Sequence, residues 1–155
     1  MTKKIAQIGI IAALYATLTI ALAPISYGNI QFRFSEVLTL MAFFNPVFIP
    51  GLTLGTFIAN LFSPLGIVDV AFGTIATFIS VYLVNKSKNL IIASIWPIII
   101  NGIIIGIELY YVFQLPLLLS MFQVAIGEFV VVSVVGVILF KTFIMKQKWF
   151  ENIVK

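Results

Sequence analysis

The apolar positions of this chain gather into six stretches, separated by breaks that are polar or contain proline and glycine. The first stretch covers residues 5–23, the second begins near Glu36, and the others cover 52–62, 69–84, 90–107 and 118–140. A helix needs about 20 apolar residues to cross the roughly 30 Å hydrocarbon core of a bilayer. A dozen residues at about 1.5 Å each cover only about 18 Å. The pattern therefore predicts an all-α membrane protein with about six transmembrane helices, of which the second and third are short.

The short stretches either span with the help of flanking residues or enter as a re-entrant hairpin surrounded by protein. Asn45-Pro46 and Pro50-Gly51 lie between them and are expected to break any helix. Residues 24–35 form the longest polar stretch and are expected to be a loop or a partly helical cap. Residues 1–155 are expected to form a single transmembrane domain, because short loops leave no room for a separate soluble one.

The eight lysines occupy three segments at the ends of these stretches. They are Lys3 and Lys4, Lys86 and Lys88, and then Lys141, Lys146, Lys148 and Lys155. An even number of crossings separates each segment from the next, so all three are expected on one side of the membrane. Positively charged loops stay in the cytoplasm. We therefore expect an N-in/C-in protein of the cell membrane, whose lysine-rich tail with Trp149 and Phe150 forms an interfacial helix.

The composition agrees with a hydrocarbon environment. Of the 155 residues, 62% are hydrophobic and only 9% are charged, whereas a soluble domain carries about a quarter charged residues. The net charge of +4 comes mainly from dispersed lysines, so it indicates membrane topology and not nucleic-acid binding. The chain has no cysteine and no histidine, which excludes disulfides and removes the commonest metal ligand and general base. No metal site and no cofactor are expected.

Most of the other charged residues lie toward the opposite ends of the stretches. Arg33, Glu36, Asp69 and Glu108 fall at or near these outer ends, whereas Glu128 lies well inside the sixth stretch. A charge inside a bilayer is costly and normally faces the interior of a helix bundle or a wet cavity. Glu128 is therefore a candidate functional residue, and Asn101 lies at similar depth. The sequence predicts a carboxylate-rich cavity that opens outward.

Most of these residues also have a structural interpretation. Arg33 and Glu36 are three positions apart and would pair across one helical turn. Glu36 and Asp69 each start a helix, where a carboxylate complements the helix dipole. Glu108 would be the solvated end of the fifth helix, and Asn101 would join two helices by a hydrogen bond worth about 0.6 kcal/mol.

Small residues recur at spacing four in two stretches. The first carries Ala12 and Ala16, and the third carries Gly51, Gly55 and Ala59. Such faces let helices approach closely in lipid. Packing within the chain is the simpler interpretation, and a docking surface for another protein is the alternative.

Two segments carry a resemblance to a known family. Residues 27–36 (YGNIQFRFSE) and 59–66 (ANLFSPLG), followed by Asp69 and Phe72-Gly73, resemble the QueT family. Its members are substrate-binding (S) components of energy-coupling-factor (ECF) transporters for queuosine precursors. The resemblance implies a six-helix protein that captures a vitamin-like solute from outside, while a transmembrane subunit and two ATPase subunits drive transport.

The resemblance also implies the partners of the chain. The first helix of S components often forms part of the docking surface; Ala12 and Ala16 match that pattern, although Leu14 and Tyr15 make the rest of the face bulky. No Gly-x-x-x-x-Gly-Lys-Ser/Thr loop occurs, so the chain is not expected to hydrolyse ATP itself or to be an enzyme. The expected partners are an ECF transmembrane subunit, two ATPase subunits and membrane lipid.

The implied ligand is a deazaguanine such as preQ1, preQ0 or queuine. Its amidine-like edge offers two N–H donors to one carboxylate, and its carbonyl oxygen needs an amide or arginine donor. If the ligand carries an aminomethyl group, a second carboxylate would pair with that cation. The residues expected to bind it are Glu128, Glu36, Asp69, Asn60, Glu108, Arg33 and Asn101, under a cap formed by residues 24–34.

Other classes of function stay open. A stand-alone proton-coupled carrier would use Glu128 and Asp69 as relay groups, although the sequence shows no obvious repeat with paired broken helices. An S component for another vitamin would share the architecture but not the ligand, and a structural membrane subunit would bind no solute. An intramembrane hydrolase has the least support, because the chain lacks histidine, cysteine and a recognisable Ser-Lys or paired-Asp motif.

Overall fold

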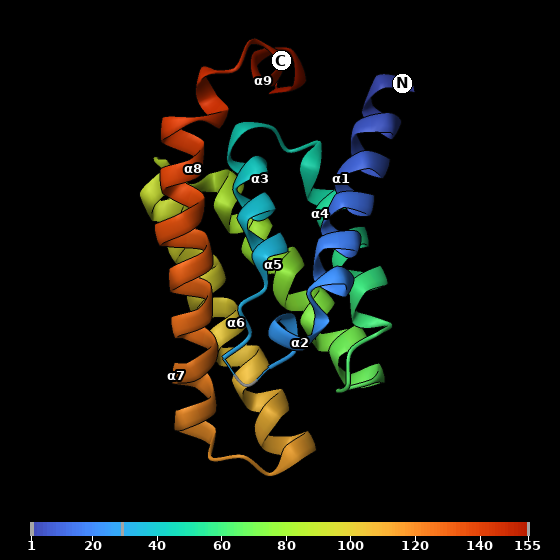
Figure 1. Ribbon diagram of the computed structural model, residues 1–155, viewed down its shortest axis with the longest axis vertical. Helices are drawn as coiled ribbons and strands as arrows, with labels where there is room; N and C mark the ends of the chain where they lie inside the picture. The colour runs from blue at the N-terminus through green and yellow to red at the C-terminus, as the bar shows by residue number, and fades with distance from the viewer. Residues whose placement is uncertain (1, 29, 155) are drawn as a thin grey trace.

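The computed structural model describes residues 2–28 and 30–154, which form six helical segments along the long axis of a bundle (Figure 1). In chain order these are α1 (Thr2–Ala21), η1 with α3 (Phe34–Leu40, Met41–Phe44), α4 (Phe48–Asn60), η2 with α5 (Asp69–Gly73, Thr74–Lys86), α6 (Leu90–Phe113), and α7, η3 and α8 (Leu117–Glu128, Phe129–Gly136, Val137–Thr142). The short helices α2 (Ala23–Ser26), η4 (Ile144–Lys146) and α9 (Lys148–Val154) lie outside these segments. The helices η1 and η4 are 3-10 helices, whereas η2 and η3 are π-helices.

Three stretches within the described residues are long and apolar enough to cross a membrane: Thr2–Ala21, Leu90–Phe113 and Leu117–Lys146. The helices Phe34–Phe44 and Phe48–Asn60 are also apolar but shorter. With about 2.0 Å per residue in the 3-10 turns and about 1.5 Å in the α-helical ones, each reaches only about 20 Å. The predictions of an all-helical membrane fold and of short second and third segments are therefore confirmed. The number of complete spans and the orientation stay predictions.

Two predicted helix boundaries differ from the structure. Asn45-Pro46 separates α3 from α4 as predicted, but Pro50-Gly51 lies inside α4 and does not break it. Pro50 is in the first turn of α4, where the backbone N–H has no partner within the helix, so proline is tolerated there. At the far end of the bundle, α6 continues to Phe113 instead of ending near Ile107.

The first and last helices meet at one end of the bundle, which is uppermost in Figure 1. The last carbonyls of α9 accept hydrogen bonds from Lys3 Nζ (Asn152 O, 3.0 Å), Gln7 Nε2 (Ile153 O, 2.8 Å) and Asn45 Nδ2 (Val154 O, 2.9 Å). The end of α5 reaches the same region, because Asn85 Nδ2 donates to the carbonyl of Ala42 at 2.6 Å. The described parts of all three lysine segments thus lie at one end, as the topology prediction requires. Lys155 and Asn29 lie outside the described residues.

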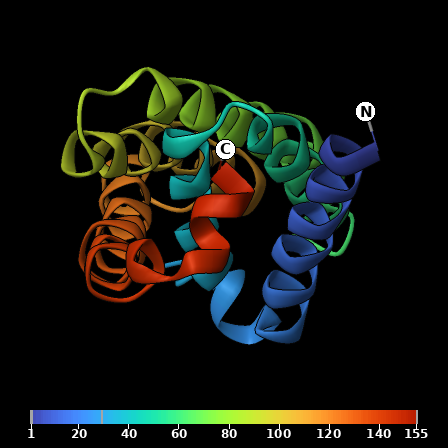
Figure 2. The ribbon, with the colours of Figure 1, turned by 90° about the horizontal axis from the view of Figure 1, so that it is seen from above.

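The C-terminal tail contains the predicted helix, which lies across the end of the bundle (Figure 2). Phe150 of α9 is buried and packs edge-to-face against Phe44 and Phe140, with ring centroids at 4.9 and 6.1 Å. Trp149, the next residue back, is exposed. The helix therefore has one aromatic face toward the protein and one toward its surroundings, as an interfacial helix does.

The small residues of α1 and α4 build an internal contact. A Cβ at Gly55 would lie 2.8 Å from the carbonyl oxygen of Ala12, and a Cβ at Gly51 would lie 2.2 Å from Cγ2 of Ile11. Ala12 and Ala16 are both buried, with 3% and 6% of their surfaces exposed. Their side chains are thus enclosed within the chain, which agrees with the simpler interpretation of the spacing.

Candidate functional site

A guanidinium group lies inside the bundle where η1 begins. Arg33 Nη2 lies 3.7 Å from Oδ2 of Asp69 in η2, and Nη1 donates to Oδ1 of Asn60 in α4 at 3.4 Å. Asn60 Nδ2 in turn donates to the backbone carbonyl of Asp69 at 2.9 Å. The guanidinium also lies over the ring of Tyr27, 5.5 Å from its centroid. These contacts join segments far apart in the sequence, and they replace the considered pairing of Arg33 with Glu36.

Glu36 instead connects η1 to α1. Its Oε1 accepts a hydrogen bond from the hydroxyl of Tyr15, and both residues are buried. Its Oε2 has no hydrogen-bond partner among the described residues. Close by in sequence, the hydroxyls of Thr19 and Ser35 share a hydrogen bond of 2.6 Å, which holds the start of η1 against α1.

Glu128 is the last residue of α7 and connects it to α6. Its Oε1 accepts a 2.8 Å hydrogen bond from Nδ2 of Asn101, while its Oε2 has no hydrogen-bond partner among the described residues. Glu128 also interacts electrostatically with Glu36 and Arg33. Glu36, Arg33 and Glu128 therefore belong to one cluster, although they come from different segments.

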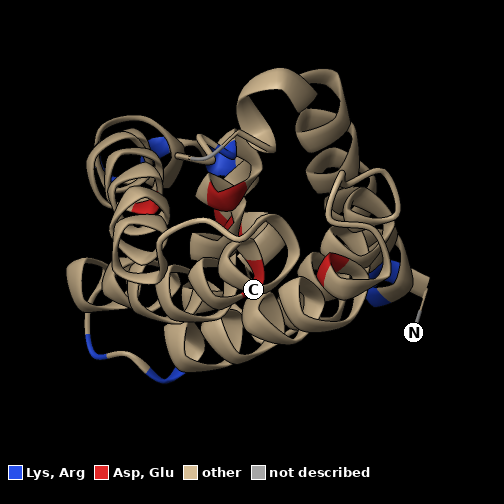
Figure 3. Cartoon of the chain, turned by 90° about the horizontal axis from the view of Figure 1, so that it is seen from below, with Lys and Arg blue, Asp and Glu red and all other residues tan. Residues whose placement is uncertain are grey.

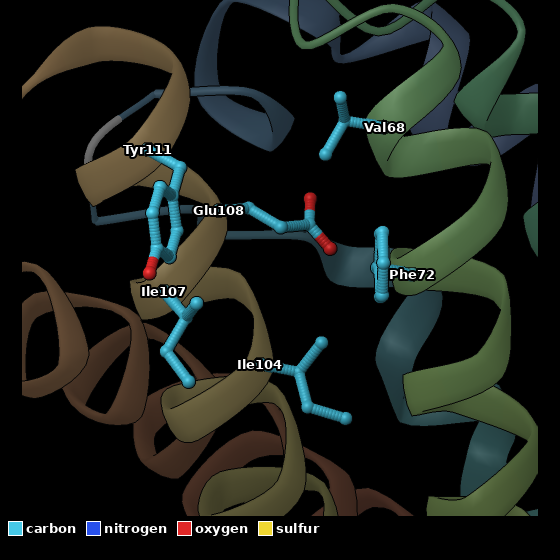
Figure 4. A pocket seen from close by; sticks show the side chains of 6 residues that line it. All are labelled: Val68, Phe72, Ile104, Ile107, Glu108 and Tyr111. Atoms are coloured by element: carbon cyan, nitrogen blue, oxygen red, sulfur yellow. The ribbon is translucent and has the colours of Figure 1, made fainter.

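Glu108 is not the solvated helix end that was considered as an alternative. Because α6 extends beyond it, only 3% of its surface is exposed, and both of its carboxyl oxygens lack a hydrogen-bond partner among the described residues. It interacts electrostatically with Asp69 and Arg33. Its side chain lines a cavity of about 410 Å³ between η2 and α6 (Figure 4), together with Val68, Phe72, Ile104, Ile107 and Tyr111.

Three of the four carboxyl groups lie in or beside helices that depart from α geometry. Glu36 is in the 3-10 helix η1, Asp69 begins the π-helix η2, and Glu128 directly precedes the π-helix η3. Single π-helical turns occur frequently at functional sites. In η2, Gly73 leaves room for the carboxylate, because a Cβ there would lie 2.0 Å from Oδ1 of Asp69 and 2.8 Å from Nδ2 of Asn60. A side chain at position 73 would therefore displace the Asp69 carboxylate.

The described residues of the connection between α1 and η1 contact the segments that carry this cluster. The described residues of 24–35 are partly helical, as predicted, because they include most of α2 and the start of η1. A Cβ at Gly127 would lie 2.0 Å from the carbonyl oxygen of Ile30, so the connection rests directly on the backbone of α7. Its other side is tied to α4, because the hydroxyl of Tyr27 donates to the carbonyl of Ala59 at 2.6 Å.

The structure brings the seven predicted binding residues together in the interior. They are Arg33, Glu36, Asn60, Asp69, Asn101, Glu108 and Glu128, and all are buried. Figure 3 shows acidic positions on several helices of the bundle. Each of the four carboxyl groups keeps at least one oxygen without a hydrogen-bond partner among the described residues. An unpaired buried polar group costs about 1–3 kcal/mol, and more when charged, so the arrangement favours a ligand that donates several hydrogen bonds or carries positive charge.

A comparison with protein families matches residues 5–145 to the QueT transporter family. The chain belongs to this family. A curated relative from Lactococcus lactis subsp. cremoris (strain MG1363), named queuosine precursor transporter QueT, is 36% identical over 146 residues, covering 83% of this chain and 85% of the relative. No solved structure matches the chain. The resemblance drawn from the sequence is thus confirmed, and this QueT family member is a multi-pass transport protein of the cell membrane.

Three residues of the site in this QueT family member have roles that the sequence did not predict. Tyr15 lies on the small-residue face of α1, where it looks like an obstacle to close packing; its hydroxyl in an apolar stretch is the signal that it needs a polar partner. Gly73 enters only as part of the family motif and Gly127 carries no such signal, because the role of each glycine depends on which atoms approach it in the fold.

Proposed function

We propose that this QueT family member is the S component of an ECF importer and captures a queuosine precursor, a deazaguanine such as preQ1, preQ0 or queuine, from outside the cell. The name of the relative from Lactococcus lactis supports this ligand class. The observation that carries the proposal is the buried cluster, in which Arg33 pairs with Asp69 and interacts electrostatically with three further carboxyl groups. Each of the four carboxyl groups keeps an oxygen without a hydrogen-bond partner among the described residues. Such a cluster suits a flat heterocycle rich in N–H donors.

In this proposal, Glu36 and Glu128 recognise the heterocycle. Each uses Oε1 within the protein and keeps Oε2 without a hydrogen-bond partner among the described residues. The N–H donors of a guanine-like edge would meet these two oxygens, and a hydrogen bond to a charged group contributes about 1.5–3 kcal/mol. Arg33 Nε and Nη2 also lack hydrogen-bond partners among the described residues, so one of them would donate to the ring carbonyl.

Ligand entry requires the cap of residues 24–34 to move, since the cluster beneath it is buried. The cap touches α7 at Gly127 and α4 through Tyr27. We assign it as the outer gate, which admits solute when it leaves α7 and excludes water when it returns. Exclusion of water strengthens the charged contacts inside.

Transport itself would be driven by a transmembrane subunit and two ATPase subunits that dock on α1. Ala12 and Ala16 are enclosed within the chain, so we assign the contact to the adjacent, exposed face of α1 and give these two residues a supporting role beside it. That face exposes Gly9, Ala13 and Thr17 at spacing four, and a Cβ at Gly9 would have no atom within 4 Å. Small residues of this kind allow a partner helix to approach closely.

The test is to purify the chain in detergent and identify its retained small molecules by mass spectrometry, followed by titration with preQ1, preQ0 and queuine. A retained or tightly bound deazaguanine supports the proposal, and a different heterocycle would overturn the ligand class. The same protein alone in liposomes should bind the ligand without accumulating it. Accumulation driven by a proton gradient would instead identify a stand-alone carrier.

A further inference from the structure

Glu108 differs from the other carboxyl groups of the cluster in its surroundings. The carboxyl groups of Glu36 and Glu128 each accept one hydrogen bond from the protein, and that of Asp69 forms an ion pair with Arg33. Neither oxygen of Glu108 has a hydrogen-bond or ion-pair partner among the described residues. Glu108 is also the residue through which the cluster meets the 410 Å³ cavity between η2 and α6. Figure 4 shows its carboxyl group extending from α6 toward Val68 and Phe72, while Tyr111 lies on the other side of the Glu108 side chain.

The other residues that line the cavity leave this carboxylate without compensation. They are Val68, Phe72, Ile104, Ile107 and Tyr111, and their contribution is almost entirely apolar. Burying an ionised carboxylate in such surroundings is costly unless a positive charge or a proton accompanies it. The guanidinium of Arg33 forms its ion pair with Asp69 and interacts with Glu108 only at longer range, so Glu108 has no ion pair of its own among the described residues.

The residues that line the cavity favour an organic ammonium ion over a metal ion. The described residues contain no group of three acidic, histidine or cysteine side chains that would hold a metal ion. Aliphatic walls suit the carbon stem of an organic amine, and the aromatic ring of Phe72, toward which the carboxyl group extends, attracts an ammonium group. An ammonium ion also supplies N–H donors for both free oxygens of Glu108.

We propose that the cavity between η2 and α6 is a subsite for a protonated amine of the ligand, with Glu108 as its counter-ion. The inference rests on the proposed function, in which Glu36 and Glu128 receive the heterocycle. Arg33 interacts electrostatically with both Glu108 and Glu128, so its positive charge acts on both parts of the site. Recognition is thereby divided between a heterocycle subsite and an ammonium subsite, and the chain prefers an aminomethyl deazaguanine to its neutral nitrile analogue.

Isothermal titration of two ligands against three proteins tests this division. The ligands are the aminomethyl deazaguanine preQ1 and its nitrile analogue preQ0, and the proteins are wild type, Glu108→Gln and Glu128→Gln. Glu108→Gln should weaken binding of preQ1 by about tenfold or more and leave preQ0 within about twofold, because only preQ1 carries the cation. Glu128→Gln should weaken both ligands by similar factors, since both share the heterocycle.

Two results would overturn the subsite while leaving the proposed function intact. One is an equal loss of preQ1 and preQ0 affinity in Glu108→Gln, and the other is unchanged affinity for both ligands in that variant. Failure of wild type to bind either deazaguanine would instead overturn the proposed function, and the subsite with it. Thermal unfolding of each ligand-free variant shows that a loss of affinity reflects the site and not a loss of fold.

Discussion

Nδ2 of Asn101 donates a 2.8 Å hydrogen bond to Oε1 of Glu128, and this contact joins the middle of α6 to the last residue of α7. The two helices approach closely nearby, since a Cβ at Gly106 would lie 2.5 Å from Cγ of Met121. The carboxyl group of Glu128 is therefore held through one oxygen. Its second oxygen remains an acceptor without a hydrogen-bond partner among the described residues.

Glu128→Gln tests this free acceptor, because it keeps the shape of the side chain and removes its charge. We expect deazaguanine binding to weaken about tenfold to a hundredfold, since a hydrogen bond to a charged group contributes about 1.5–3 kcal/mol. Isothermal titration in detergent measures the affinities. Glu151→Gln, on the exposed surface of α9, is the control and should bind as tightly as wild type. An unchanged affinity in Glu128→Gln would make this residue structural.

Gly127→Ala tests the cap as a gate. The new Cβ would lie 2.0 Å from the carbonyl oxygen of Ile30, so the cap must lift from α7. Overpacking of this kind costs about 1–3 kcal/mol, and we expect ligand dissociation to accelerate about tenfold. Stopped-flow measurement of ligand release checks the rate.

The cap itself offers the matched control for this variant. A Cβ at Gly28 would lie 3.6 Å from the carbonyl oxygen of Pro24, an ordinary contact. Gly28→Ala should therefore release ligand at the wild-type rate. Identical release rates for Gly127→Ala and Gly28→Ala would show that the cap does not control access.

The apolar stretches predict most of the fold, because a helix in lipid must satisfy its backbone hydrogen bonds internally. The predicted helix boundaries that were wrong lie at helix ends, where the local backbone geometry determines which residue ends the helix. Pro50 is tolerated in the first turn of α4. The helix α6 ends at Gln114 in the left-handed conformation, with φ of 55°, a position usually held by glycine or asparagine. A glutamine there carries no sequence signal for a helix end.

The site is predicted less completely than the fold. Its acidic residues stand out because charges are costly in apolar stretches, but their partners depend on tertiary contacts. Glu36 accepts its hydrogen bond from Tyr15 of another helix, and Arg33 forms its ion pair with Asp69, although it also interacts electrostatically with the nearby Glu36. Sequence spacing favours neighbours along one helix, and it does not reveal the 3-10 and π-helical turns that redirect these side chains.

Tyr15→Phe tests the contact between α1 and η1. The substitution removes the hydroxyl that donates to Glu36 and leaves a buried carboxyl oxygen unpaired. We expect a loss of about 1–3 kcal/mol of folding stability, seen as a lower midpoint of thermal unfolding in detergent. Tyr110→Phe, at an exposed position of α6, should unfold like wild type. Equal midpoints for both variants would remove Tyr15 from the structural support of the site.

The membrane topology can be tested with single introduced cysteines, because the chain has no cysteine of its own. Lys88→Cys places a thiol in the α5–α6 connection near the lysine-rich end, and Ile67→Cys places one in the α4–η2 connection, where Ile67 is 78% exposed. With the lysines cytoplasmic, a membrane-impermeant maleimide added to intact cells should label position 67 and not position 88. The reverse pattern would invert the orientation, and lysed cells provide the control in which both positions react.

The last prediction concerns the docking face of α1. Ala13→Trp adds a bulky side chain to the exposed face, so it should block assembly with the transmembrane and ATPase subunits and abolish uptake while ligand binding by the isolated chain stays at the wild-type level. Ala16→Trp changes the enclosed face instead, where overpacking costs about 1–3 kcal/mol; it should lower the thermal stability of the chain itself. Co-purification with the partner subunits and thermal unfolding distinguish the two effects. Assembly and uptake at wild-type levels in Ala13→Trp would move the docking surface away from this face of α1.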